Sequence, residues 1–128
     1  MSIMLKIRWE IAEGREPEFR KNQQQLCTVM RDDHPGVICY HVDYPARGVS
    51  EWVEIYANDA VFKAHLANEK GKAPLAAVIG ACAKITCRCW GDPDAESREI
   101  LAGFGTTYQE TAAASFALHP RADRASKL

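Results

Sequence analysis

The sequence predicts an α+β fold in which the elements follow the order strand, helix, strand, strand, helix, strand. Four short segments alternate apolar and polar residues with a period of two, which is typical of strands with one buried face. Two longer segments repeat apolar residues at helical spacing. This order is the split βαβ, ferredoxin-like arrangement, in which both helices cover one face of an antiparallel four-stranded sheet.

The first strand is predicted over residues 3–11, because every second residue in this segment is apolar. Its apolar side carries Ile3, Leu5, Ile7, Trp9 and Ile11. The next helix is predicted to begin at Glu16-Pro17, since proline is tolerated in the first turn of a helix. It is expected to end at His34-Pro35-Gly36, where proline and glycine interrupt helical geometry.

A hairpin is predicted after this helix. Alternating residues indicate strands over residues 37–44 and 52–56, and the residues between them include a proline and a glycine that favour a turn. On the second strand of the hairpin, Trp52, Glu54 and Tyr56 share one side. The alternation does not decide whether that side faces the helices or the opposite side of the sheet.

The second helix is predicted to begin at Asn58-Asp59, because short polar side chains accept hydrogen bonds from the free amides of a first helical turn. Phe62, His65 and Leu66 lie on one stripe of this helix. A titratable imidazole within an apolar stripe is either a core residue with a satisfied hydrogen bond or a residue of a functional site.

This helix is expected to run over residues 59–69, to break at Gly71 to Pro74 and then to restart. The last strand of the sheet is predicted over residues 85–90. We therefore place the domain at residues 1–92. A C-terminal helical extension is expected over residues 93–128, packed on the domain or on a dimer partner.

Length and composition favour one ordinary globular domain. A chain of 128 residues with 47% hydrophobic and 26% charged residues can bury a substantial core. The formal net charge of −1 disfavours a nucleic-acid partner. No apolar run reaches the roughly 20 residues of a membrane span, and the first ten residues carry charge too early for a signal peptide. We expect a cytoplasmic location.

The chain contains five cysteines. An odd number without a secretion signal indicates reduced thiols rather than a disulfide framework. Cys87 and Cys89 share one strand face and Cys82 lies shortly before them, so a soft-metal site is one interpretation. Small buried hydrophobic residues are the favoured interpretation, because no CxxC pair or partner histidine completes a zinc-ligand set. No metal site is therefore predicted.

The side of the predicted sheet opposite the helices is left uncovered. It would carry Lys6, Arg8 and Glu10 together with apolar side chains from the other strands. A large half-apolar face is usually covered in a folded protein. A second copy of the chain is the simplest cover.

Several positions match a known family. An acidic residue near the end of a strand, Glu54, is followed after one residue by an aromatic, Tyr56. The other matching residues are the helix start Asp59, the histidine His65 and the glycines Gly14 and Gly36. Over about residues 4 to 92 the chain resembles the antibiotic biosynthesis monooxygenase domain family of the dimeric α+β barrel superfamily. The resemblance implies a homodimer whose two sheets face each other, and a pocket in each subunit between sheet and helices.

The resemblance makes His65 the candidate catalytic base, because a base with a pKa near 7 suits deprotonation of a phenol. Tyr56 or Trp52 would hydrogen-bond a substrate oxygen. The full set of expected substrate-binding side chains is Ile7, Trp9, Trp52, Glu54, Tyr56, Phe62 and Leu66.

Two of these residues also have structural interpretations. His65 is equally consistent with a helix histidine that is hydrogen-bonded to a neighbouring carbonyl. Glu54 is either a buried acid beside the pocket or the partner of Arg8 or Arg88 across the strands. The cross-strand pair is the favoured interpretation.

The activity that the resemblance implies is oxidation of a small quinol- or anthrone-like aromatic by O₂ without a metal, flavin or other cofactor. The sequence agrees in lacking a dinucleotide-binding glycine pattern and a P-loop. Relatives that degrade haem use an asparagine, a tryptophan and a histidine at positions that here hold Ile7, His65 and Leu75, so haem breakdown is disfavoured. A non-redox binding or isomerase-like protein, or a non-catalytic dimer, stays open.

Overall fold

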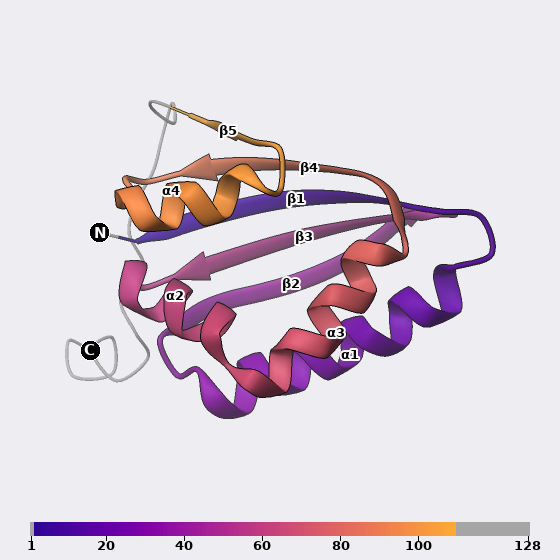
Figure 1. Ribbon diagram of the computed structural model, residues 1–128, viewed down its shortest axis with the longest axis horizontal. Helices are drawn as coiled ribbons and strands as arrows, with labels where there is room; N and C mark the ends of the chain where they lie inside the picture. Colours follow the sequence, from indigo (N-terminus) through magenta and orange to yellow (C-terminus); the bar gives the residue numbers. More distant parts are fainter. Residues whose placement is uncertain (1, 110–128) are drawn as a thin grey trace, which may run out of the picture.

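The computed structural model describes residues 2–109. Figure 1 shows their arrangement. The elements in chain order are β1 Ile3–Ile11, α1 Glu16–Asp33, β2 Val37–Ala46, β3 Val49–Tyr56, α2 Asp59–Ala67, α3 Glu69–Gly80, β4 Cys82–Trp90, α4 Ala95–Ala102 and β5 Thr106–Tyr108. The predicted α+β fold is confirmed, including the order of its first strands and helices.

The sheet has five strands in the order β2-β3-β1-β4-β5. The first four pair antiparallel, as predicted, and β5 adds a parallel edge next to β4. The sequence prediction missed this fifth strand, because it lies in the segment that was expected to be a helical extension.

The extension is therefore helical only in part. After α4, Gly105 adopts φ 61, which glycine reaches without steric cost, and the chain turns back toward the sheet. The Thr106 hydroxyl donates to the Leu101 carbonyl at 2.6 Å and fixes this turn. Residues 110–128 of the predicted extension lie outside the described residues.

The break between the two middle helices lies at Asn68 and not at Gly71 to Pro74 as predicted. Asn68 has extended backbone angles, and its side chain accepts a hydrogen bond from the Lys70 amide at 3.0 Å, which caps α3. Pro74 is then accommodated inside α3, where its ring is buried. The Asn68 side chain therefore sets the start of α3, although Gly71 and Pro74 are of the types that most often interrupt a helix.

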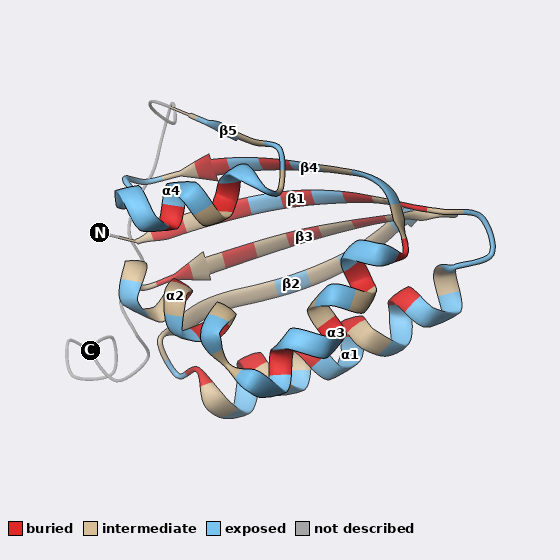
Figure 2. Cartoon of the chain, in the orientation of Figure 1, coloured by how far each residue is buried: buried red, intermediate tan, exposed pale blue. Residues whose placement is uncertain are grey.

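All four helices lie on one side of the sheet (Figure 1). Buried residues alternate with less buried ones along β1 and β3 (Figure 2), and the buried residues of both strands belong to the hydrophobic core. Along β1 every second residue is buried, from Ile3 to Ile11, and this row forms the floor of the core. The opposite sheet face carries Lys6 and Arg8, as predicted, and no helix covers it within residues 2–109. No helix in that range is long and apolar enough to cross a membrane.

Candidate functional site

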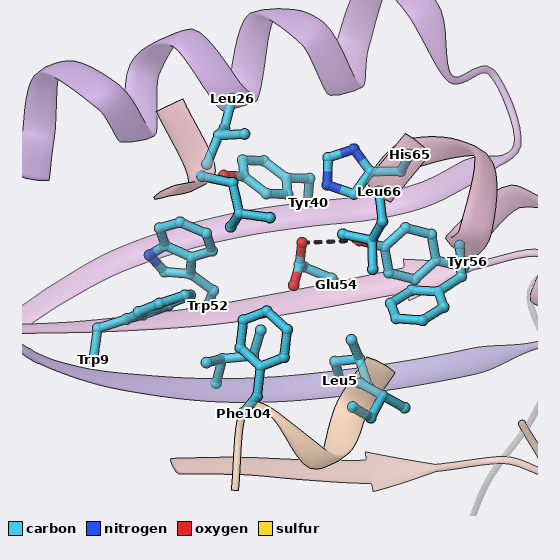
Figure 3. A pocket seen from close by; sticks show the side chains of 14 residues that line it. Leu5, Trp9, Leu26, Tyr40, Trp52, Glu54, Tyr56, His65, Leu66 and Phe104 are labelled. Carbon is cyan, nitrogen blue, oxygen red and sulfur yellow. Dashed lines mark hydrogen bonds between the residues drawn. The ribbon is translucent and has the colours of Figure 1, made fainter. Parts of the chain in front are cut away.

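A small cavity lies between the sheet and the helices. Its volume is about 30 Å³, and the residues that line it come from three strands and all four helices, or directly follow them. All eight residues predicted for a site line this one cavity: Ile7, Trp9, Trp52, Glu54, Tyr56, Phe62, His65 and Leu66. Figure 3 shows most of these side chains around the same space.

Two elements position the polar side chains of the site. On β3 the alternation of the strand turns Trp52, Glu54 and Tyr56 toward the helices, which settles the orientation that the sequence left open. The adjacent helix α2 begins at Asn58, whose side chain accepts from the Val61 amide at 3.0 Å. This start sets the rotation of α2 and buries His65 over the end of β3.

Glu54 is a buried acid with one hydrogen bond. The Tyr56 hydroxyl donates to its Oε1 at 3.0 Å (Figure 3), and the residue is 4% exposed. Burial raises the pKa of Glu54 to about 7, and the hydrogen bond from Tyr56 opposes this increase only in part. The carboxyl of Glu54 therefore holds its proton more tightly than an exposed glutamic acid does.

The favoured cross-strand pairing of Glu54 with Arg8 or Arg88 is wrong. Arg8 pairs with Glu51 at 2.9 Å on the opposite face of the sheet. Glu54 points away from that face, because residues three apart on a strand lie on opposite sides. Among residues 2–109 its carboxyl therefore has no arginine partner to hold it ionised.

His65 is buried beside the same cavity. Its ring stacks on Tyr56 with 6.1 Å between centroids and meets the edge of His34 at 5.3 Å. Burial lowers the pKa of His65 to about 4, with a smaller contribution from His34, so the ring is neutral at pH 7. Its Nδ1 atom has no hydrogen-bond partner among residues 2–109, so the carbonyl bond expected for a purely structural histidine does not form at this atom.

Two indoles form the end of the cavity opposite His65. The rings of Trp9 and Trp52 contact each other with 4.6 Å between centroids. Trp52 donates its indole N–H to the Ser50 hydroxyl at 2.9 Å, whereas the Trp9 indole nitrogen has no partner in the described part of the chain. Trp52 therefore offers the cavity only its apolar ring surface, whereas the indole N–H of Trp9 is available as a hydrogen-bond donor.

Six further residues complete the cavity wall and were not predicted as site residues: Leu5, Leu26, Tyr40, Leu75, Leu101 and Phe104. Strand alternation carried enough signal to find Leu5, and Tyr40 lies directly opposite Glu54 in the register of β2 and β3. Leu101 and Phe104 come from α4 and the turn after it. No local pattern indicates where such a segment packs.

The cysteines do not form a second site. Cys87 and Cys89 lie within the hydrophobic core, and burial raises their pKa values to about 11 and about 12. Between Ser2 and Gln109, no three His, Cys, Asp or Glu side chains gather closely enough to hold a metal ion. His41 lies exposed on the open sheet face.

Comparison with known proteins identifies solved structures that share this fold. No family model and no curated protein matches the chain. Several solved structures share its fold. One is a protein from Caulobacter crescentus that is named provisionally as an antibiotic biosynthesis monooxygenase, with TM-score 0.64 and 21% identity over 73% of this chain and 91% of that one. Another is MupZ from Pseudomonas fluorescens, with TM-score 0.67 and 15% identity over 91% and 89%.

A third is SnoaB from Streptomyces nogalater, a cofactor-independent oxygenase solved as a point mutant, with TM-score 0.59 and 9% identity over 73% and 94%. The chain therefore has the fold of the antibiotic biosynthesis monooxygenase structures, as the sequence resemblance implied. At these identities the comparison establishes the fold. The activity has to be argued from the site.

Proposed function

We propose that the protein is a cofactor-independent monooxygenase that oxidises a small electron-rich aromatic, of quinol or anthrone type, with O₂. The observation that carries this proposal is a buried acid, Glu54, in a cavity walled by aromatic rings beside the free Nδ1 of His65. Such a cavity excludes water from a reactive anion and offers a proton acceptor without any cofactor.

In this mechanism Glu54 is the general base. Its pKa of about 7 matches the requirement for a base at neutral pH, whereas the pKa of His65, at about 4, makes the imidazole a weaker base than the one that the sequence suggested. The neutral His65 ring would hold the substrate oxygen through a hydrogen bond. Trp9, Phe62 and Leu66 would position the aromatic rings.

The reaction starts when the Glu54 carboxylate takes the proton of a phenol or of the phenolic tautomer of an anthrone. The anion passes one electron to O₂, the two radicals combine, and the resulting peroxide collapses to a quinone with loss of water. A CH₂ group of an anthrone becomes C=O in this sequence. One oxygen atom of O₂ enters the product and the other leaves as water.

We also propose that the protein acts as a cytoplasmic homodimer. All five cysteines are free thiols, which suits a reducing compartment. The open sheet face carries charges of both signs, including the Arg8–Glu51 ion pair, together with half-buried apolar side chains. A second copy of the chain packed on this face about a two-fold axis would remove that apolar surface from water.

Oxygen consumption with 1,8-dihydroxyanthrone tests the activity. We expect one O₂ consumed for each anthraquinone formed, no free hydrogen peroxide, and a rate that rises with pH through about 7 as Glu54 ionises. Glu54→Gln should lower kcat by roughly 100-fold or more, whereas Glu69→Gln on the exposed side of α3 should leave it unchanged. No oxygen uptake across a panel of anthrones and hydroquinones would refute the proposal.

One observation favours a second candidate, a dimer that serves as an interaction module without a substrate pocket. A cavity of about 30 Å³ has room for only one or two water molecules. No oxygen uptake, and no rise in melting temperature with saturating anthrones, hydroquinones or anthraquinones, would support this alternative.

A further inference from the structure

The cavity around Glu54 is too small for an organic ligand, so a substrate can bind there only if one wall moves. Pockets that enclose organic ligands usually have volumes of roughly 300 to 1,000 Å³. The cavity, at about 30 Å³, lies an order of magnitude below that range. The question is therefore which wall separates the cavity from a space that can take an aromatic ring.

A much larger space lies on the far side of one wall. It is a surface groove of about 570 Å³ between the second half of α1 and the start of β2. Its lining is mainly apolar or sulfur-bearing and includes Cys27, Met30, Pro35, Val37 and Cys39. Such a surface fits the face of a planar aromatic molecule.

Tyr40 is the side chain that the cavity and the groove have in common. It lies directly opposite Glu54 in the register of β2 and β3. A second contact crosses the same wall, because His65 lines the cavity, His34 lines the groove, and their rings meet at 5.3 Å. The wall is therefore one layer of side chains thick at this point.

We propose that the groove between α1 and β2 is the entrance and outer part of the substrate site, and that Tyr40 is the gate between groove and cavity. The identity of the ligand rests on the proposed function. With the Tyr40 ring swung into the groove, one substrate ring takes its place beside Glu54 and His65, and the remaining rings lie along the groove.

The surroundings of Tyr40 allow this movement at low cost. Its hydroxyl is buried, and its one candidate partner among the described residues is the Gln23 side chain, which already accepts from the Tyr44 hydroxyl at 3.2 Å. Displacement therefore costs at most one weak hydrogen bond and gives the hydroxyl access to water. Its ring contacts Trp52 edge to face at 5.8 Å, a contact that an incoming aromatic ring can replace. Within residues 2–109, β2 is an edge strand, and its register with β3 shifts between Val37 and Cys39.

Anaerobic binding of two probes tests the inference, with the fluorescence of Trp9 and Trp52 as readout. The probes are 1,8-dihydroxyanthraquinone, which would occupy both cavity and groove, and phenol, whose single ring would occupy only the space beside Glu54 that the displaced Tyr40 ring leaves. Cys27→Trp narrows the groove and should weaken binding of the anthraquinone about tenfold, with phenol affinity unchanged. Tyr40→Ala, or Tyr40→Leu if the alanine variant is unfolded, should raise the association rate of both probes about fivefold or more.

The matched control is Thr28→Trp, which adds the same bulk to the exposed neighbour of Cys27 outside the groove and should bind like the wild type. Equal anthraquinone affinity in Cys27→Trp and wild type, or unchanged association rates in both Tyr40 variants, would overturn the inference. Oxygen uptake that is insensitive to Cys27→Trp would also overturn it and leave the proposed function standing. If anthraquinone binding depends on the groove but no oxygen is consumed, the proposed function is refuted, and the inference about the groove and Tyr40 stands.

Discussion

Glu54 and His65 line the same cavity, and burial moves their pKa values in opposite directions. The acid binds its proton more tightly than it does in an unfolded chain, and the imidazole binds its proton less tightly. Both residues are neutral near pH 6. Near that pH neither residue therefore places a charge in the cavity.

This pair leads to a prediction about stability and pH. Glu54 is protonated in the folded state between about pH 4.5 and 7 but ionised in the unfolded state, so its contribution to stability is lost as pH rises through this window. His65 is neutral in the folded state between about pH 4 and 6.5 but protonated in the unfolded state, so its contribution is lost as pH falls. In the wild type the two effects largely cancel.

Single variants should remove that balance. Relative to wild type, Glu54→Gln should become more stable at pH 8 than at pH 5, and His65→Gln should change in the opposite sense, each by at most about 3 kcal/mol. Urea unfolding at a series of pH values measures both slopes. Parallel curves for the two variants and wild type would show that neither group titrates as described.

The side chain directions within strands explain how much of the site the sequence could predict. Alternation alone put Ile7 and Trp9 on one side of β1, and Trp52, Glu54 and Tyr56 on one side of β3. It could not choose the side for β3. The nearby arginines made a surface ion pair plausible for Glu54, whereas the structure gives Arg8 to Glu51 instead.

At the scale of elements, α4 contributes wall residues of the cavity although it lies outside the predicted domain. Leu101 is 1% exposed and reaches the core. At the surface, Lys63 of α2 forms ion pairs with Asp94 at 2.9 Å and Glu96 at 3.1 Å. The segment is thus held by one apolar anchor and by a set of exposed charges.

These two kinds of contact should differ in strength. Leu101→Ala should cost roughly 2–5 kcal/mol of unfolding free energy, because it leaves a cavity in the core. Lys63→Ala should cost less than about 1 kcal/mol, since its partners are exposed to solvent. Urea unfolding of the two variants under identical conditions compares them directly. A larger loss for Lys63→Ala would mean that charge, and not apolar packing, holds α4.

The elements that the sequence mispredicted share a physical cause. The helix break at Asn68 depends on a cap that competes with Gly71 and Pro74, and β5 forms because Thr106 to Tyr108 find the free edge of β4. The helix and strand propensities of a short sequence window include neither the effect of the Asn68 cap nor the neighbouring edge of β4. The same limit applies to Phe104, because no local pattern indicates where its side chain packs.

At the scale of the whole molecule, the open sheet face is the surface that bears on whether two copies associate. Met4, Ile55 and Trp90 form a continuous half-buried apolar row across β3, β1 and β4, and the charged residues flank it. Covering such a row removes apolar surface from water, which favours association of two copies.

Ile55→Arg should therefore convert a dimer into a monomer at micromolar concentration, because it places a charge in the centre of the proposed interface. Gln24→Arg, on the exposed side of α1, is the control with the same added charge. Sedimentation velocity gives both masses. The same mass for the wild type and Ile55→Arg would argue that another surface, or none, joins the subunits.

The contribution of α4 to the cavity wall has a consequence for redesign. Leu101 and Phe104 are encoded after the last long strand, so their segment can be exchanged without altering the order or register of the four antiparallel strands. Grafting shorter or bulkier versions of residues 95–105 onto one unchanged scaffold would yield a series of proteins with graded cavity volumes. The range of ligands accepted by such a series could then be tuned without altering Glu54, the proposed general base.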